Sequence, residues 1–272
     1  MTASHTRVGP HLPHLVEGLK DGPAIVLINS IGMTMPIWDT QVPELSPRMK
    51  VVRYNQRGHE GAPAPDGPYS LADLGTDLID LMDSLGLERA SICGLSLGGL
   101  VAMWTAAHAP DRIDRLVVAC SSARPADPAK WSSRATLART AGVPAVIAQS
   151  SLGWFTPEFA HAHADVLERL RAAAGRTPSE GYAGCCDALR TADVMDDLPS
   201  IAAPTLVIAG ERDHGFPLDH ARAVQQGIAG SELVVLPDTA HIAPVESPAA
   251  FGAALRHHLG FPEPATTEGV SA

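Results

Sequence analysis

The sequence predicts an α/β protein with a mostly parallel, doubly wound sheet and a cap of helices inserted after its sixth strand. Short runs of apolar, β-branched residues alternate with helical patterns over most of the 272 residues, and that order is typical of a parallel sheet. The chain is 45% hydrophobic and 18% charged, which is enough apolar material for one sizeable core. One Ala-rich stretch interrupts the alternation and is helical in pattern, so we expect it to form the cap.

The expected elements follow one another in a simple order. Apolar runs predict strands at residues 12–18, 24–29, 49–54, 90–93, 115–120, 204–209 and 232–236. Helical patterns predict helices at residues 36–45, 71–85, 100–108, 218–228 and 247–259, the second of them capped by Ser70. We expect residues 1–123 and 199–262 to form the core, residues 124–198 the cap, and residues 263–272 a disordered tail.

A Gly-x-Ser-x-Gly pattern centred on Ser96 lies between an expected strand and an expected helix. In that context the pattern is the nucleophile elbow of α/β-hydrolases. The sharp turn strains the serine backbone, while Gly94 and Gly98 let the strand and the helix approach each other. The Ser96 hydroxyl is then expected at the carboxyl end of the sheet. The competing interpretation is a Gly-rich loop with an incidental serine.

An acid and a histidine follow the serine in the chain order of this fold. Asp213 comes after the strand expected at 204–209, and His241 comes after the last expected strand. Loops at the carboxyl edge of one sheet would therefore carry all three side chains. His241 could act as general base toward Ser96, and Asp213 could orient its ring. Asp238 is the alternative acid.

The oxyanion hole of such a site needs two backbone N–H donors. The residue after the nucleophile, Leu97, is expected to supply one of them. The loop Ser30-Ile31-Gly32 after the strand at 24–29 is expected to supply the other, from Ile31. The competing interpretation of this loop is a simple turn between a strand and a helix.

Composition and charge exclude several classes of partner. The formal net charge is −10 without a Lys/Arg cluster, which argues against nucleic acid and anionic membranes. No targeting segment or long apolar stretch occurs, so we expect a cytoplasmic protein. The four cysteines form no zinc or disulfide pattern, and no phosphate-binding or dinucleotide fingerprint occurs, so neither metal nor cofactor is expected. The oligomeric state stays open.

Nine short segments carry a resemblance to one family that extends from about residue 24 to 259. They lie at residues 29–32, 38–39, 41–43, 57–59, 67–70, 93–96, 107–110, 154–157 and 181–186. The chain resembles the 3-oxoadipate enol-lactonases of aromatic degradation. Trp-Phe-Thr-Pro at 154–157 and Gly-Tyr-Ala-Gly-Cys-Cys at 181–186 are its more specific motifs. The sequence departs from the family pattern at Asn55, where aspartate is usual, and at Glu60, where glycine is usual.

The resemblance implies a serine hydrolase that opens the ring of 3-oxoadipate enol-lactone in the β-ketoadipate pathway. That substrate carries a carboxylate, so an acidic protein needs a local cation to bind it. We expect Arg134 to supply the cation and Trp131 and Trp154 to form an apolar wall around the ring. Two alternatives remain: a carboxylesterase or lactonase with another small-molecule substrate, and a hydrolase-fold protein that binds a ligand without turnover.

Overall fold

A seven-stranded sheet forms the centre of the computed structural model, which describes residues 7–261. Its strands lie in the order β1-β3-β2-β4-β5-β6-β7, and only the edge strand β1 runs antiparallel to its neighbour, β3. The strands are β1 (His14–Gly18), β2 (Ala24–Ile28), β3 (Lys50–Tyr54), β4 (Ala90–Leu95), β5 (Ile113–Ala119), β6 (Thr205–Gly210) and β7 (Glu232–Leu236). The predicted α/β fold with a mostly parallel sheet is confirmed.

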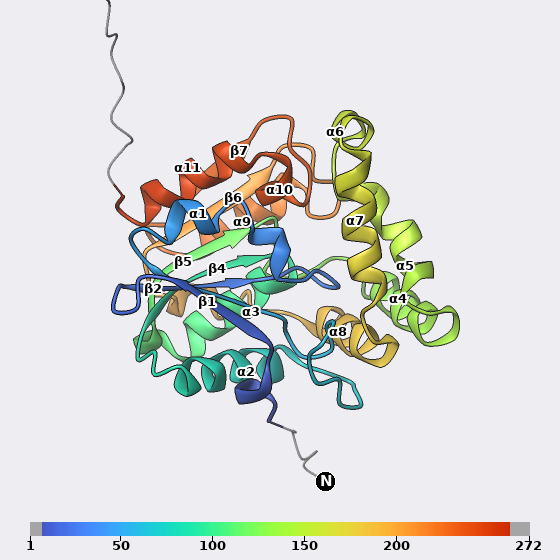
Figure 1. The fold of residues 1–272 in the computed structure, drawn as a ribbon, viewed down its shortest axis with the longest axis horizontal. Helices are drawn as coiled ribbons and strands as arrows, with labels where there is room; N and C mark the ends of the chain where they lie inside the picture. Colours follow the sequence, from blue (N-terminus) through green and yellow to red (C-terminus); the bar gives the residue numbers. More distant parts are fainter. Residues whose placement is uncertain (1–6, 262–272) are drawn as a thin grey trace, which may run out of the picture.

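Helices cover both faces of the sheet (Figure 1). Helices α2 and α3 lie on one face, and α1 and α11 lie on the other. On the second face the Trp38 and Phe251 rings are 6.1 Å apart between centroids. The helices are α1 (Val42–Leu45), α2 (Leu71–Ser84), α3 (Leu97–His108), α4 (Pro128–Ala141), α5 (Val143–Ser150), α6 (Pro157–Ala162), α7 (Ala164–Gly175), α8 (Ser179–Thr191), α9 (Leu218–Gly227), α10 (Ala243–Glu246) and α11 (Pro248–His258).

The central strands are apolar because both of their faces are covered. Every residue of β2, β4 and β6 is buried, as expected for parallel strands between two helical layers. Helix α2 begins at a capping box in which the Ser70 side chain accepts a hydrogen bond from the Asp73 N–H, while the Asp73 carboxylate accepts one from the Ser70 N–H. This cap satisfies backbone donors that would otherwise lack partners. The expected start of this helix is confirmed.

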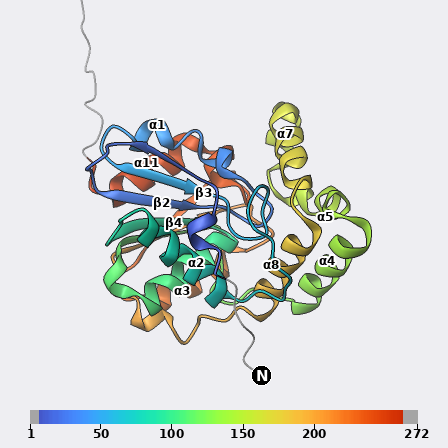
Figure 2. The same cartoon turned by 60° about the horizontal axis from the view of Figure 1, so that its bottom comes forward.

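Five helices, α4–α8, stand between β5 and β6 in the sequence, and we call them the inserted helices. They lie together beside one end of the sheet in two views (Figures 1 and 2). The expectation that they follow a sixth strand is wrong, since β5 is the fifth strand of the described residues. Among residues 7–261 only β1 precedes β2, since residues 9–11, which include Pro10, form a 3-10 helix.

The segment before β3 and the C-terminal tail differ from the other expected elements. The helix expected at residues 36–45 is split into a 3-10 helix, Met35–Trp38, and α1. Pro43 stands in the first turn of α1, where a proline is tolerated, and cannot continue a helix that starts earlier. The tail expected at residues 263–272 lies outside the described residues. Within residues 7–261, no helix is long and apolar enough to cross a membrane.

Candidate active site

Ser96 sits in a strained turn between β4 and α3. Its backbone has φ 58° and ψ −114°, which is a costly conformation for any residue but glycine. A Cβ on Gly94 would come within 2.1 Å of the Gly98 carbonyl oxygen, and one on Gly98 within 2.4 Å of the Ile28 carbonyl oxygen. Glycine at both positions therefore allows the close approach that the turn requires.

The turn is held by hydrogen bonds on both sides of Ser96. Its N–H donates to the Ala119 carbonyl oxygen at 2.9 Å. Its own carbonyl oxygen accepts a hydrogen bond from the Ser121 hydroxyl at 2.7 Å. Both partners lie at the end of β5, so the neighbouring strand braces the elbow. Such bracing is how a folded protein sustains a strained residue.

An aspartate and a histidine meet at the same edge of the sheet. Asp213 follows β6, His241 follows β7, and the Asp213 Oδ2 lies 2.8 Å from the His241 Nδ1. The N–H groups of Gly215 and Phe216 donate to the other carboxylate oxygen at 2.8 and 3.1 Å. Because the carboxylate accepts from Nδ1, the Nε2 atom of the ring is left to act as a base.

Asp213 is buried and remains a carboxylate. Burial by itself would raise the pKa of Asp213, but the His241 ring and the Phe216 and Gly215 N–H donors outweigh it and hold this pKa below its usual value. The alternative acid, Asp238, stands in a turn with φ 47° and is exposed. The structure therefore pairs His241 with Asp213.

A cavity of about 230 Å³ joins the sheet edge to the inserted helices. Ser96, His241 and Ile31 line it from the sheet side. The other lining residues are Ser30, Lys130, Trp131, Arg134, Gln149, Ser150, Gly153, Trp154, Tyr182, His214, Gly215 and Phe216. All three residues expected to bind substrate, Trp131, Arg134 and Trp154, are among them. The structure thus brings together side chains that lie far apart in the sequence.

The two expected oxyanion donors lie close to Ser96, Leu97 as the next residue of the chain and Ile31 in the lining of the same cavity. Leu97 is the first residue of α3, where a helical N–H has no partner within the helix. Ile31 lines the cavity beside Ser96. Within residues 7–261, neither the Ile31 N–H nor the Leu97 N–H donates a hydrogen bond to another protein atom. Both donors are therefore available to a ligand.

The cavity is positively charged on the side of α4. Arg134 and Lys130 place their charged groups 5.0 and 5.5 Å from the ring centroid of Trp131. Among the described residues, neither Arg134 nor Lys130 takes part in an ion pair, and no carboxylate lines the cavity. The buried Nε1 donor of Trp131 also has no hydrogen-bond partner in this part of the chain. Burial and the Arg134 charge lower the pKa of Lys130. An anionic ligand would complement this wall.

Sequence reasoning missed several residues of the cavity. Lys130 could have been found, because it precedes Arg134 by four residues and so shares its face of the helix. Gln149, Tyr182, His214 and Phe216 come from three other elements or loops. Only Tyr182 belongs to a family motif, at 181–186, and that motif does not indicate a position beside Ser96. Among the described residues no group of three or more His, Cys, Asp or Glu side chains could hold a metal ion.

This arrangement defines a class of protein. Residues 23–248 match the family described as the alpha/beta hydrolase fold. The chain therefore belongs to the α/β-hydrolase family, and the protein is a hydrolase.

Within that family the most informative relatives are enol-lactonases. The chain is 37% identical to 3-oxoadipate enol-lactonase 2 of Acinetobacter baylyi, over 90% of this chain and 91% of the relative. It superposes on the enol-lactonase structure of Burkholderia xenovorans LB400 with a TM-score of 0.90 and 37% identity, covering 92% and 96% of the two chains. The resemblance found in the sequence is confirmed. A putative carbamate hydrolase RutD of a Caulobacter species is 30% identical over 91% of this chain and 95% of its own.

Proposed function

We propose that this hydrolase opens the ring of 3-oxoadipate enol-lactone to give 3-oxoadipate, with Ser96, His241 and Asp213 as its catalytic triad. The observation that carries the proposal is the cavity, which is lined by Ser96, by His241 and by Arg134 of α4, an arginine without a carboxylate partner in the described part of the chain. The substrate combines a reactive ring carbonyl with a carboxylate a few bonds away. A cavity with a nucleophile on one wall and cations on another suits that combination. The similarity to enol-lactonases supports the choice of substrate.

In the first half of the reaction His241 takes the proton of the Ser96 hydroxyl, and the oxygen attacks the ring carbonyl carbon. The Ile31 and Leu97 N–H groups stabilise the negative charge that develops on the carbonyl oxygen. The bond to the ring oxygen then breaks. The enol oxygen receives the proton held by His241, and the enol tautomerises to a ketone. The leaving group stays attached, because opening a ring does not divide the molecule.

In the second half a water molecule attacks the acyl carbon of the ester on Ser96. His241 removes a proton from this water and returns one to the serine oxygen. The product leaves with two carboxylates, and the serine hydroxyl is restored. Asp213, ionised throughout, holds the His241 ring in place and stabilises its charged form.

The side chains of the inserted helices account for the choice of substrate. Arg134 would pair with the acetate carboxylate, with Lys130 beside it, while Trp131 and Trp154 cover the ring. We assign residues 124–198 to a cap and residues 1–123 and 199–262 to the hydrolase core on this basis, because the inserted helices supply recognition and the sheet edge supplies the nucleophile.

The test is to measure turnover of 3-oxoadipate enol-lactone, p-nitrophenyl acetate and a simple carbamate by the wild-type protein and by Ser96→Ala. We expect the lactone to give by far the highest kcat/KM and Ser96→Ala to lose activity on every substrate. A preference for the carbamate would favour the activity named for the RutD relative. A preference for the neutral ester would indicate a carboxylesterase. Ligand binding without any turnover would indicate a binding protein and overturn the triad assignment.

A further inference from the structure

We propose that His59 is a positioning residue that fixes the oxyanion-hole loop through a hydrogen bond from the Gly32 N–H. The inference rests on the proposed function, since it takes Ile31 as an oxyanion donor. Its basis is a buried histidine outside the triad, whose ring connects the cavity loop to a rigid ion-pair network below it.

The loop is a four-residue turn, Ser30 to Met33. The Met33 N–H donates to the Ser30 carbonyl oxygen at 3.0 Å, and Gly32 has φ 73°, as the third residue of a type II turn requires. The Ser30 carbonyl and the Ile31 N–H belong to one trans peptide and so point in opposite directions. With the carbonyl directed into the turn, the Ile31 N–H is directed out of it, toward the cavity that Ile31 lines.

His59 restrains the next peptide of the same turn. The Gly32 N–H donates to the His59 Nε2 at 2.9 Å. Nε2 lies 2.9 Å from the Gly32 nitrogen and 3.3 Å from the Ser30 carbonyl oxygen. It can accept from Gly32 only when it carries no proton, and this shorter contact assigns the proton of the neutral ring to Nδ1, which then donates to the Arg57 carbonyl oxygen at 3.1 Å. Burial lowers the pKa of His59 and so favours this neutral form, although its backbone partners oppose the shift. Both peptides that define the turn are thus restrained.

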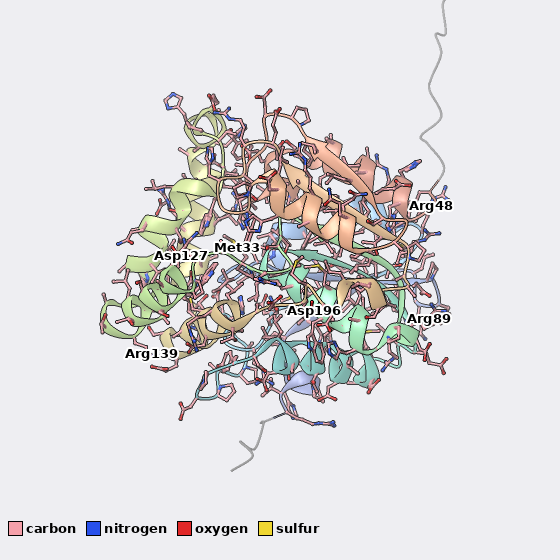
Figure 3. All side chains as sticks on the ribbon, turned by 180° about the vertical axis from the view of Figure 1, so that it is seen from behind. Met33, Arg48, Arg89, Asp127, Arg139 and Asp196 are labelled. Atoms are coloured by element: carbon pink, nitrogen blue, oxygen red, sulfur yellow. The ribbon has the colours of Figure 1, made fainter. Side chains whose placement is uncertain are left out.

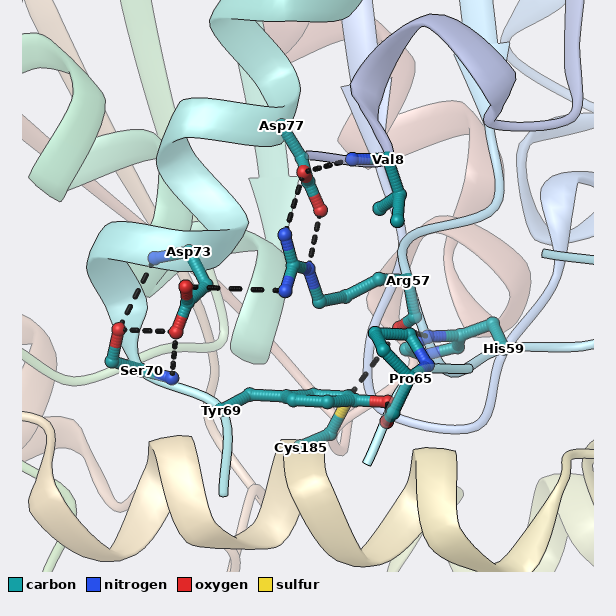
Figure 4. Close-up of polar contacts among 9 residues, drawn as sticks. All are labelled: Val8, Arg57, His59, Pro65, Tyr69, Ser70, Asp73, Asp77 and Cys185. Carbon is teal, nitrogen blue, oxygen red and sulfur yellow. Dashed lines mark hydrogen bonds and ion pairs between the residues drawn. The ribbon is translucent and has the colours of Figure 1, made fainter. Parts of the chain in front are cut away.

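A buried ion-pair network holds the segment that carries His59. The Arg57 guanidinium forms two hydrogen bonds with Asp77, at 2.5 and 2.7 Å, and lies 3.9 Å from Asp73 (Figure 4). The Cys185 thiol lies 3.6 Å from the Arg57 carbonyl oxygen that also binds His59. These groups on α2 and α8 are buried, so they hold the residues before the imidazole in one position.

The inserted helix α8 packs directly onto this connection. A Cβ on Gly58 would come within 2.6 Å of the Gly181 carbonyl oxygen, and one on Gly32 within 3.1 Å of the Tyr182 ring. The loop is therefore enclosed between His59 on one side and α8 on the other. Loss of the hydrogen bond between the Gly32 N–H and His59 would release the turn only on the His59 side. We therefore expect the Ile31 N–H to be displaced in a protein that stays folded.

The test compares two amide variants of His59. In His59→Gln the side-chain oxygen can reach the Nε2 position and accept from Gly32. In His59→Asn the shorter amide can reach only the Nδ1 position, so it keeps a donor for the Arg57 carbonyl and loses the acceptor. Removing a whole oxyanion donor costs about 10²–10³ in kcat, so we expect His59→Asn to lower kcat roughly ten- to a hundredfold with KM nearly unchanged. His59→Gln should stay within about threefold of wild type by the same reasoning.

A second readout separates this role from a purely structural one. A trifluoromethyl ketone places an oxyanion in the hole after addition of the serine, so its affinity should fall in proportion to kcat in His59→Asn and recover in His59→Gln. Equal kcat in all three proteins, or a loss of kcat without a loss of inhibitor affinity, would overturn the proposal. NMR of protein labelled with ¹⁵N-histidine provides a test on wild type alone: the proton of His59 must lie on Nδ1, and a proton on Nε2 contradicts the proposal even if no variant folds.

The two proposals fail in distinguishable ways. The His59 measurements use p-nitrophenyl acetate as well as the lactone, so they stand if the natural substrate is another ester. If Ser96→Ala hydrolyses both substrates as well as wild type does, the proposed function itself is refuted.

Discussion

Replacing Arg134 by alanine tests how the cavity recognises a carboxylate. The guanidinium lines the cavity, lies over the Trp131 ring and, among the described residues, has no carboxylate partner. A hydrogen bond between charged groups contributes about 1.5–3 kcal/mol, and each 1.36 kcal/mol corresponds to a tenfold change in rate. The full effect would therefore be roughly ten- to a hundredfold.

Lys130 changes the magnitude that we expect from this single substitution. It stands one helical turn before Arg134 and lines the same cavity, so one cation remains after the other is removed. We therefore expect Arg134→Ala to lower kcat/KM for the carboxylated lactone by about tenfold, and the double variant with Lys130→Met by about a hundredfold. Turnover of p-nitrophenyl acetate, which has no carboxylate, should change by less than about threefold in either variant.

Arg139→Ala is the matched control, since it removes an arginine from the same helix without touching the cavity. Arg139, labelled in Figure 3, is exposed. It pairs with Glu180 and Asp187 of α8. Its loss should leave the ratio of the two kcat/KM values unchanged. An equal loss on lactone and ester in Arg134→Ala would mean damage to the inserted helices, and an unchanged lactone rate would refute the proposed contact.

The remaining predictions concern the triad and the buried network. Ser96→Ala should lose many orders of magnitude of kcat while keeping the wild-type circular dichroism spectrum, and near wild-type turnover would contradict its role. Asp213→Asn should lower kcat by about a thousandfold or more, because the amide no longer fixes the tautomer of the general base. Burial lowers the pKa of His59, so on acidification the unfolded chain binds a proton at this residue before the folded protein does. The stability of the fold should therefore fall as the pH drops below about 6.5. Thermal melts of His59→Gln should show a shallower decline. Asp77→Asn should lower the free energy of unfolding by about 1.5–3 kcal/mol in urea titrations, because Arg57 loses its two hydrogen bonds to a carboxylate and keeps only the more distant Asp73.

The alternation of apolar runs and helical patterns was enough to predict the sheet and most of the helices. Parallel strands covered on both faces are apolar throughout, so runs such as Ala24–Ile28 are visible in the sequence itself. The elbow could also be predicted, because its glycines are dictated by local backbone crowding at Ser96. The order of serine, acid and histidine then indicated Asp213 and His241, since each follows its own strand.

Local patterns were less informative for the helical segment at residues 35–45 and for the number of strands before the inserted helices. Pro36 and Pro43 both mark starts of helices, and the sequence did not reveal that each begins a separate short helix. The five strand ranges expected before the inserted helices all form, including the edge strand β1, and the sixth strand expected there is not found among the described residues.

Only the tertiary structure revealed which residues line the cavity and which backbone group His59 contacts. Tyr182, Phe216 and Gln149 reach the site from separate segments, and no periodicity connects them to Ser96. His59 looks like any histidine in a Gly-containing loop until folding brings its Nε2 to the Gly32 N–H. Sequence alone determined the strands and the elbow at Ser96, because those depend on local backbone geometry and burial. The neighbours that set charge, shape and donor position depend on long-range packing, which local patterns do not encode.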